Sequence, residues 1–326
     1  MTNIKYAMVG TGLMADLILR DFALSENTEL YALVSRESAK AEAKLADLGI
    51  DAKALTFDQA LIDPQVDVIY IASPHSEHFW MAKAALEAGK HILVEKAFMN
   101  SADEAEEIFA LAKAKNLFAM EAMWTKFIPL HNHLKELVDS GAIGKLRLIE
   151  ANFGFPRTYD TSHRLFAKEL GGGSSLDQGV YTTTLNRWFA DAEISELKAT
   201  GFNYENGTDA TAMTDFVFAN GVRGRGNSSL ATAFGLGARI CGDEAIIEID
   251  EAFWNSTTAR IKRYIVDTDR VEIEEISVEK RGAGYVHMLE AVSTSVLAGE
   301  IENEKHPHSF TIEVMRALDE VRSQIS

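Results

Sequence analysis

The chain has 326 residues, of which 47% are hydrophobic and 25% are charged, and its formal net charge is −17. This length predicts two domains of ordinary globular composition. The negative charge argues against nucleic acid or an anionic membrane as a partner. The single cysteine, Cys241, excludes an internal disulfide. With no visible signal peptide or membrane-spanning segment, we expect a protein of the reducing cytoplasm.

Residues 1–121 alternate apolar runs with stretches rich in Ala, Leu, Glu and Lys. The apolar runs predict buried parallel strands at 4–9, 30–34, 66–72, 91–94 and 117–120. The stretches between them predict helices at 13–23, 39–48, 79–88 and 102–115. Strands and helices in alternation predict an α/β domain with a doubly wound parallel sheet of the Rossmann type.

The pattern changes after Glu121. A predicted helix at 129–139 precedes segments with period-two alternation, which predict a large, mostly antiparallel open sheet. These strands are expected at 146–153, 193–202, 210–218, 222–230, 245–249, 260–266 and 271–276, and the last two helices at about 284–297 and 308–323. We therefore expect a dinucleotide-binding domain over 1–121 and an α+β domain over 122–326.

The loop Gly10-Thr11-Gly12-Leu13-Met14-Ala15 follows the first strand and opens a helix, which is the context of a Rossmann fingerprint. Gly10 permits the tight turn, Gly12 lets the backbone approach a pyrophosphate, and Ala15 still allows close helix packing. The N–H groups at the helix start suit phosphates. The alternative is a glycine turn that binds nothing. We predict dinucleotide contacts from Gly10, Thr11, Gly12, Leu13 and Met14.

The second strand ends in Ser35 and Arg36, where a site that prefers NAD usually has Asp or Glu. A hydroxyl and a guanidinium suit a 2′-phosphate instead. NADP is therefore the predicted cofactor, with NAD possible. The alternative is that Arg36 is an ordinary surface charge.

Two further motifs are Ser73-Pro74-His75 with His78, and Ala88-Gly89-Lys90-His91 with Glu95-Lys96. Together with the glycine loop they resemble the glucose–fructose oxidoreductase / inositol dehydrogenase / MocA (GFO/IDH/MocA) family along essentially the whole chain. Segments 120–125 and 170–181 resemble its dihydrodiol dehydrogenase and D-xylose dehydrogenase branch. The chain departs from the family at Ala97, where proline is usual. Many relatives have histidine at the position of Tyr181, where the dihydrodiol branch has tyrosine.

The resemblance implies that Ser73, Pro74, His75, His78, Glu95 and Lys96 lie at the dinucleotide, with Lys96 also catalytic. Oxidation of an alcohol needs a hydride acceptor and a base for the hydroxyl proton. Tyr181 is the predicted acid/base, and a nearby ammonium such as Lys96 would lower its pKa from about 10.

Asp177 lies four residues before Tyr181 and shares its face if the segment is helical. It is predicted to orient the lysine or a substrate hydroxyl. The alternatives are a buried Lys96–Glu95 pair, a core tyrosine and a helix cap at Asp177.

Aromatic residues are candidate walls of a pocket for the apolar faces of sugars or cyclic diols. The resemblance supports Trp124, Phe153 and Trp254, and we add Phe155; the alternative is that these rings fill the core. Arg164 is a candidate contact to substrate or cofactor phosphate. No metal is expected, because neither His131/His133 nor His306/His308 has partners at zinc-like spacing. We expect these histidines on the surface.

These features predict an NADP-dependent oxidoreductase that transfers a hydride between nicotinamide and a CH–OH group of a sugar, polyol or cyclic trans-diol. The alternatives are inositol oxidation, keto-sugar reduction, or a regulator that binds a dinucleotide without turnover. A large apolar face on the open sheet would need to be covered. The resemblance implies a second subunit there, in a homodimer or higher homo-oligomer.

Overall fold

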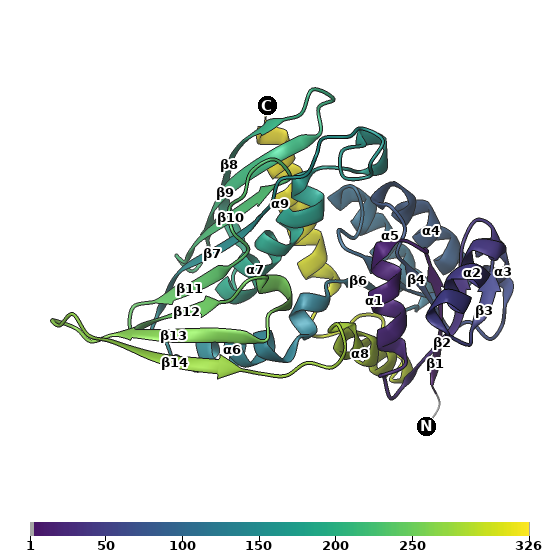
Figure 1. The fold of residues 1–326 in the computed structure, drawn as a ribbon, viewed down its shortest axis with the longest axis horizontal. Helices are drawn as coiled ribbons and strands as arrows, with labels where there is room; N and C mark the ends of the chain where they lie inside the picture. The colour runs from purple at the N-terminus through teal and green to yellow at the C-terminus, as the bar shows by residue number, and fades with distance from the viewer. Residues whose placement is uncertain (1–2, 326) are drawn as a thin grey trace. The chain divides into compact units, whose positions relative to one another are not determined.

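The computed structural model describes residues 3–325, which divide into two compact units (Figure 1). The first unit comprises Met1–Phe127 and Arg281–Ile312, and the second comprises Ile128–Lys280 and Glu313–Ser326. The sequence-based division places everything after residue 121 in one domain. In the structure the chain instead returns to the first unit for 281–312.

The first unit contains a six-stranded parallel sheet with the order β3-β2-β1-β4-β5-β6. Its strands are β1 (Ile4–Val9), β2 (Thr28–Val34), β3 (Lys53–Leu55), β4 (Val68–Ile71), β5 (His91–Glu95) and β6 (Ala119–Ala122). Its helices are α1 (Leu13–Phe22), α2 (Ser38–Leu48), α3 (Phe57–Ile62), α4 (His75–Glu87), α5 (Ala102–Lys115), the short η1 (Trp124–Phe127) and α8 (Tyr285–Leu297). The predicted Rossmann sheet is confirmed. β3 and α3 were missed because each is too short to show a periodic pattern.

Segment 281–312 joins the first unit through buried polar contacts. The Asp21 carboxylate, 1% exposed, accepts hydrogen bonds from the main-chain N–H groups of Ala283 and Tyr285 at 2.9 and 2.8 Å. Tyr6 Oη lies 2.9 Å from Ser293 Oγ on α8. A carboxylate at the start of α8 satisfies N–H groups that have no partner inside the helix. This explains why a segment so far along the chain packs against α1 and β1.

The second unit contains an eight-stranded sheet with the order β14-β13-β12-β11-β7-β10-β9-β8. Its strands are β7 (Leu146–Gly154), β8 (Ile194–Asn203), β9 (Asp209–Phe218), β10 (Arg223–Ser229), β11 (Ala238–Gly242), β12 (Ala245–Ile249), β13 (Thr258–Tyr264) and β14 (Val271–Ser277). All neighbouring pairs are antiparallel except β7 and β10. The predicted sheet is confirmed, although β11 was missed.

Helices cover one face of this sheet: α6 (Pro129–Asp139), α7 (Val180–Ala190) and the later part of α9 (His308–Gln324) (Figure 1). On that side, Ala199 and Ala212 pack with Val321 of α9 and with Ile325, which directly follows α9. The opposite, open face carries charged cross-strand pairs. Arg225 pairs with Asp215 at 2.8 Å, and Lys262 pairs with Glu248 at 2.7 Å. The open face therefore combines charged pairs with exposed apolar side chains, such as Met213, Tyr264 and Ile273, whereas strand alternation puts the buried apolar residues on the helix side.

His131 and His306 are buried, at 0% and 1% exposed, which corrects their expected place on the surface. His131 Nε2 lies 2.7 Å from the carbonyl oxygen of Phe253 and links α6 to η4 (Phe253–Asn255). His306 Nε2 lies 3.0 Å from Glu121 Oε2. Burial lowers the pKa of both imidazoles to about 4. Both histidines thus serve the packing of the core in the neutral form.

These pKa values link stability to pH. The unfolded chain binds more protons than the folded chain between about pH 6.5 and 4, so stability falls as the pH falls through this window. We expect His131 to account for about 2 kcal/mol of the loss between pH 7 and pH 5. His131→Gln keeps a side-chain N–H for Phe253 but cannot titrate, so its stability should depend less on pH by that amount. Urea unfolding at both pH values measures the difference.

The matched control is His133→Gln, because His133 is exposed on the same helix. It should behave as the wild-type protein does. An equal pH dependence in the His131→Gln variant and the wild type would contradict the linkage.

Candidate functional site

The candidate site in the first unit lies where the order in which the chain adds strands to the sheet reverses. The chain runs from β1 through β2 to β3 and then crosses back to β4, so β1 lies between β2 and β4. Ligands of doubly wound folds bind beyond the carboxyl ends of the strands at such a point. Four predicted groups follow these strand ends: the loop from Gly10, the pair Ser35 and Arg36, the segment from Ser73, and Lys96.

The glycine loop fits a dinucleotide. Gly10 has φ +121°, and a Cβ atom there would lie 2.5 Å from the carbonyl oxygen of Ala72, so only glycine is accommodated. A Cβ atom on Gly12 would meet nothing within 4 Å. No side chain caps the first turn of α1, which begins directly after Gly12. The loop therefore offers open space and a helix N-terminus to a pyrophosphate.

Ser35 and Arg36 follow β2, as predicted. The Ser35 hydroxyl donates to the carbonyl of Glu37, and the Ser35 N–H donates to the carbonyl of Leu55 at 3.2 Å. Arg36 is exposed to solvent. A guanidinium at this strand end is available to an anionic group on a bound ribose.

Lys96 follows Glu95 at the carboxyl end of β5, and its peptide bond to Ala97 is cis. Glu95 is 8% exposed, and its Oε1 accepts a hydrogen bond from Tyr70 Oη at 2.6 Å. Burial raises the pKa of the Glu95 carboxyl, and the hydrogen bond from Tyr70 and the charge of Lys96 oppose that shift. Tyr70 could not be recognised as a site residue from its sequence context, because it lies in a buried apolar strand.

The main chain after Lys96 is held by side chains. His78 is fully buried, with Nδ1 3.1 Å from the carbonyl oxygens of both Ala97 and Phe98. His75 Nε2 lies 3.2 Å from the Lys96 carbonyl oxygen and from the Ala97 nitrogen. The resemblance implies that both imidazoles lie at the dinucleotide; in the structure their ring nitrogens face main-chain atoms.

Glu121, at the end of β6, completes this arrangement. Its Oε1 accepts the Phe98 N–H at 3.1 Å. Glu121 was predicted only to mark the boundary between domains. A single glutamate beside an apolar strand does not indicate a structural role, and its partner Phe98 lies 23 residues earlier.

The second unit brings three predicted aromatic residues together. The rings of Phe153 and Trp254 are stacked with centroids 3.6 Å apart, and the Tyr181 ring lies 5.6 Å from Phe153 and 6.1 Å from Trp254. Phe155 lies 5.9 Å from Phe153. Tyr181 is 6% exposed and is the second residue of α7. The phenol is thus fixed by a rigid aromatic cluster.

Asp177 lies in the π-helical turn η3 (Ser175–Gly179), which leads into α7. Its Oδ1 forms an ion pair with Arg164 Nη1 at 3.2 Å, so two predicted site residues meet. Trp124 belongs to the first unit, where its ring stacks on Tyr285 with centroids 4.4 Å apart.

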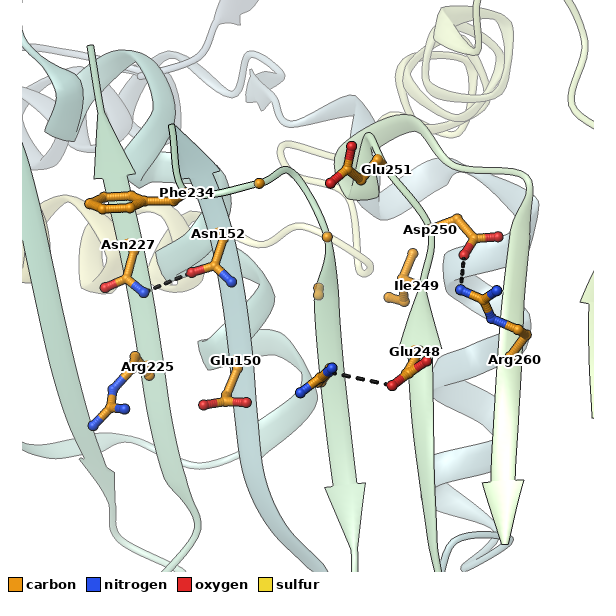
Figure 2. A pocket seen from close by; sticks show the side chains of 14 residues that line it. Glu150, Asn152, Arg225, Asn227, Phe234, Glu248, Ile249, Asp250, Glu251 and Arg260 are labelled. Atoms are coloured by element: carbon orange, nitrogen blue, oxygen red, sulfur yellow. Dashed lines mark hydrogen bonds and ion pairs between the residues drawn. The ribbon is translucent and has the colours of Figure 1, made fainter. Parts of the chain in front are cut away.

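A hollow of about 540 Å³ lies on the open face of the second sheet. Figure 2 shows Glu150, Asn152, Arg225 and Glu248 projecting into it from neighbouring strands. Asn152 and Phe153 are consecutive on β7, so their side chains point to opposite faces. The sheet therefore separates this hollow from the aromatic cluster around Tyr181.

Within residues 3–325, no group of three or more His, Cys, Asp or Glu side chains is arranged to hold a metal ion. None of the helices in the described part of the chain is long and apolar enough to cross a membrane.

Two family models match the chain. Residues 4–123 match an oxidoreductase family with an NAD-binding Rossmann fold, and residues 131–248 match the GFO/IDH/MocA C-terminal domain. Trans-1,2-dihydrobenzene-1,2-diol dehydrogenase of Mus musculus is 30% identical, over 78% of this chain and 76% of its own. The Xenopus laevis enzyme is 27% identical over 98% of both chains. D-xylose 1-dehydrogenase (NADP(+)) of Hypocrea jecorina is 37% identical over 56% of this chain and 52% of its own.

Solved structures share the fold. An aldose–aldose oxidoreductase from Caulobacter crescentus superposes with a TM-score of 0.88 at 22% identity, covering 99% of this chain and 97% of the other. A 3-ketoreductase from Actinomadura kijaniata, in complex with NADP and TDP-benzene, gives 0.87 at 22% identity, covering 99% and 98%. The chain belongs to the GFO/IDH/MocA family of oxidoreductases.

Alanine substitutions at the two loop glycines should affect different properties, which are the stability of the fold at Gly10 and the binding of the dinucleotide at Gly12. Gly10→Ala should destabilise the fold by roughly 2 kcal/mol or more, because the methyl group meets the Ala72 carbonyl at a positive φ. Gly12→Ala should change stability by less than about 1 kcal/mol, since its φ of −75° suits alanine. The same methyl group should weaken dinucleotide binding about tenfold or more by blocking the close backbone approach. Urea unfolding and calorimetric titration with NADP measure the two effects. Normal NADP affinity in the Gly12→Ala variant would contradict the assignment of this loop to the dinucleotide site.

Proposed function

We propose that this oxidoreductase uses NADP and transfers a hydride between the nicotinamide and a CH–OH group of a sugar, polyol or cyclic trans-diol. The observation that carries the proposal is the set of groups at the switch point of the first sheet: an open glycine loop, an exposed Arg36 and a lysine at the end of β5. NADP would use the first two, and the lysine ammonium would favour the phenolate that acts as the base for the hydroxyl proton.

In this proposal Tyr181 is the acid/base and Lys96 the ammonium that supports it, as the family resemblance implies. Asp177, held by Arg164, orients a substrate hydroxyl. Phe153 and Trp254 form an apolar wall against a ring substrate, and their stacking supports that role because two parallel rings make a flat surface. Trp124, set in the first unit against Tyr285, is proposed as a further wall.

The proposed reaction moves one hydride and one proton. A bound nicotinamide would supply the hydride acceptor, so that loss of a hydride from the carbon and a proton from the hydroxyl would leave a carbonyl group on the substrate. Tyr181 Oη is proposed to take the hydroxyl proton, and an ammonium group close to a phenol favours the phenolate that can accept it. In the reverse direction the same phenol returns the proton to the alkoxide.

The substrate class rests on chemistry that the chain shares with its relatives. Those relatives include enzymes named for a dihydrodiol and for D-xylose. Both substrates carry hydroxyl groups on a compact carbon frame, which suits an aromatic wall beside a carboxylate. Ser35 and Arg36 support NADP over NAD, through a hydroxyl and a guanidinium for the 2′-phosphate. Ser73, Pro74 and His75 are proposed to border the nicotinamide end, whereas the side chain of His78 is fully buried behind them.

The proposal includes a cytoplasmic homodimer, as the resemblance implies. The open face of the second sheet supports pairing by charge, because Arg225, Arg239 and Arg260 form ion pairs with acidic residues on it. An interface of this kind weakens as salt screens the charges. Sedimentation velocity at low and high salt measures that state directly.

The acid/base role is tested by Tyr181→Phe. The variant should lose about 10²- to 10⁴-fold in kcat/KM, since a positioned proton acceptor contributes that much. Reduction of NADP is followed at the reduced-nicotinamide absorbance band with D-xylose, D-glucose, inositol and trans-dihydrodiols. NADP affinity should stay as in the wild type.

The matched control is Tyr204→Phe, because Tyr204 lies in the same unit and stacks on Tyr159 at 4.5 Å. Full turnover in the Tyr181 variant would refute the acid/base role. Tight NADP binding by the wild type without turnover on any substrate would favour a dinucleotide-binding regulator.

Arg36→Ala tests the choice of cofactor. Loss of a charge-assisted hydrogen bond to the 2′-phosphate should raise KM for NADP about 10- to 100-fold. KM for NAD, which lacks that phosphate, should change by less than about threefold. The same steady-state assay with each cofactor gives both values. Parallel changes for the two cofactors would show that Arg36 does not read the phosphate.

A further inference from the structure

The three residues from Lys96 to Phe98 leave β5 without a strand partner for their main-chain groups. Six of those groups meet side chains instead. The carbonyl oxygens of Ala97 and Phe98 face His78, and the Lys96 carbonyl and the Ala97 N–H face His75. The Lys96 N–H donates to Glu95, and the Phe98 N–H donates to Glu121. Buried main-chain groups need such partners, so these side chains fix the course of the backbone at Lys96.

His78 stands out because its ring touches two strand ends. Nδ1 lies 3.1 Å from both the Ala97 and Phe98 carbonyls, and Nε2 lies 3.0 Å from the Ser73 carbonyl after β4. A carbonyl oxygen only accepts, and a neutral imidazole has one N–H to donate. The ring is fully buried, and burial lowers the pKa of His78, so the neutral form is favoured. The N–H can therefore serve one side only.

We propose that His78 is a positioning residue whose Nδ1–H holds the Ala97–Phe98 carbonyls and thereby sets the place of Lys96. Two acceptors converge on Nδ1 and one on Nε2, which favours the Nδ1–H form. In this role His78 contacts neither cofactor nor substrate. The inference rests on the proposed function for the catalytic part that it assigns to Lys96.

Two amide variants distinguish the nitrogens. The side-chain N–H₂ of asparagine reaches the place of Nδ1, whereas that of glutamine reaches the place of Nε2. His78→Asn should therefore keep the bond to the Ala97–Phe98 side, and His78→Gln should lose it. A displacement of about 1 Å at a reacting group lowers rates by about 10²-fold. We expect His78→Gln to lose 10- to 100-fold in kcat, in line with that sensitivity, and His78→Asn to stay within about threefold of the wild type.

The dissociation constant of NADP, measured by calorimetry, should change by less than about threefold in both variants, because the glycine loop is untouched. A purely structural role would lower the melting temperature of both variants without splitting their kcat values. His133→Asn, at an exposed histidine, is the matched control. A loss of tenfold or more in kcat for a folded His78→Asn, or an unchanged kcat for His78→Gln, would overturn the assignment. If the glutamine variant does not fold, the kcat of His78→Asn still tests the assignment, because a loss of tenfold or more in that folded variant contradicts it.

A second measurement needs no substrate. Lysines of the full-length, NADP-bound protein are dimethylated with ¹³C-formaldehyde, and the Lys96 resonance is assigned by its loss in Lys96→Arg. Its chemical shift should match the wild type in His78→Asn and move in His78→Gln. Identical shifts in all three proteins would overturn the positioning role. If Lys96→Met kept full activity, the proposed function of Lys96 would fail while this shift still decided the role of His78.

Discussion

The first unit depends on the close approach of the chain after β1 to the chain after β4. A side chain at Gly10 would lie 2.5 Å from the Ala72 carbonyl, so the two segments lie as close together as two backbones can. That contact occurs at the switch point, between the two strands whose connections run in opposite directions. It leaves Gly12 and the first turn of α1 open to a phosphate, and it places the Ser73 segment beside the loop. The requirement for glycine and the capacity to bind a dinucleotide have the same geometric cause.

In the second unit the main constraint is the uncovered face of the sheet. A sheet of eight strands with helices on one face leaves the other face to solvent or to a partner. Here Arg225, Asp215, Glu248 and Lys262 form cross-strand pairs on that face. Such pairs keep an exposed sheet compatible with water, and they give it a pattern of charge that another surface can match. Tyr181 and its aromatic neighbours lie on the protected side, where packing holds the rings in fixed orientations.

The long periodic elements were predictable from the sequence because their pattern reports burial directly. The parallel sheet, the antiparallel sheet and α5 (Ala102–Lys115) were predicted with bounds close to those observed. Short elements such as β3 and α3 have too few residues to show a hydrophobic period, and β11 (Ala238–Gly242) follows a loop and was not recognised as a separate strand. The return of 281–312 to the first unit was not predictable, because it depends on Asp21 meeting N–H groups more than 250 residues away.

The candidate site shows the same limit at the level of single side chains. The motifs predicted His75, His78, Glu95 and Lys96 at the dinucleotide, and in the structure they lie on α4, which follows β4, and at the end of β5. The motifs did not tell whether an imidazole turns toward a ligand or toward the backbone, which depends on whether nearby main-chain groups already have partners.

Expectations for His131 and His306 were wrong for a related reason. A pair of histidines two residues apart suggests exposed polar side chains, yet a neutral imidazole is readily buried when oxygen atoms face its nitrogen. For His131 the partner is a carbonyl oxygen, and for His306 the partners are a carboxylate and a hydroxyl. Polar side chains in this chain are thus placed largely by the main-chain groups that lack other partners. Lys96 depends on such side-chain partners, because β5 and its ladder of hydrogen bonds end at Glu95, one residue before it.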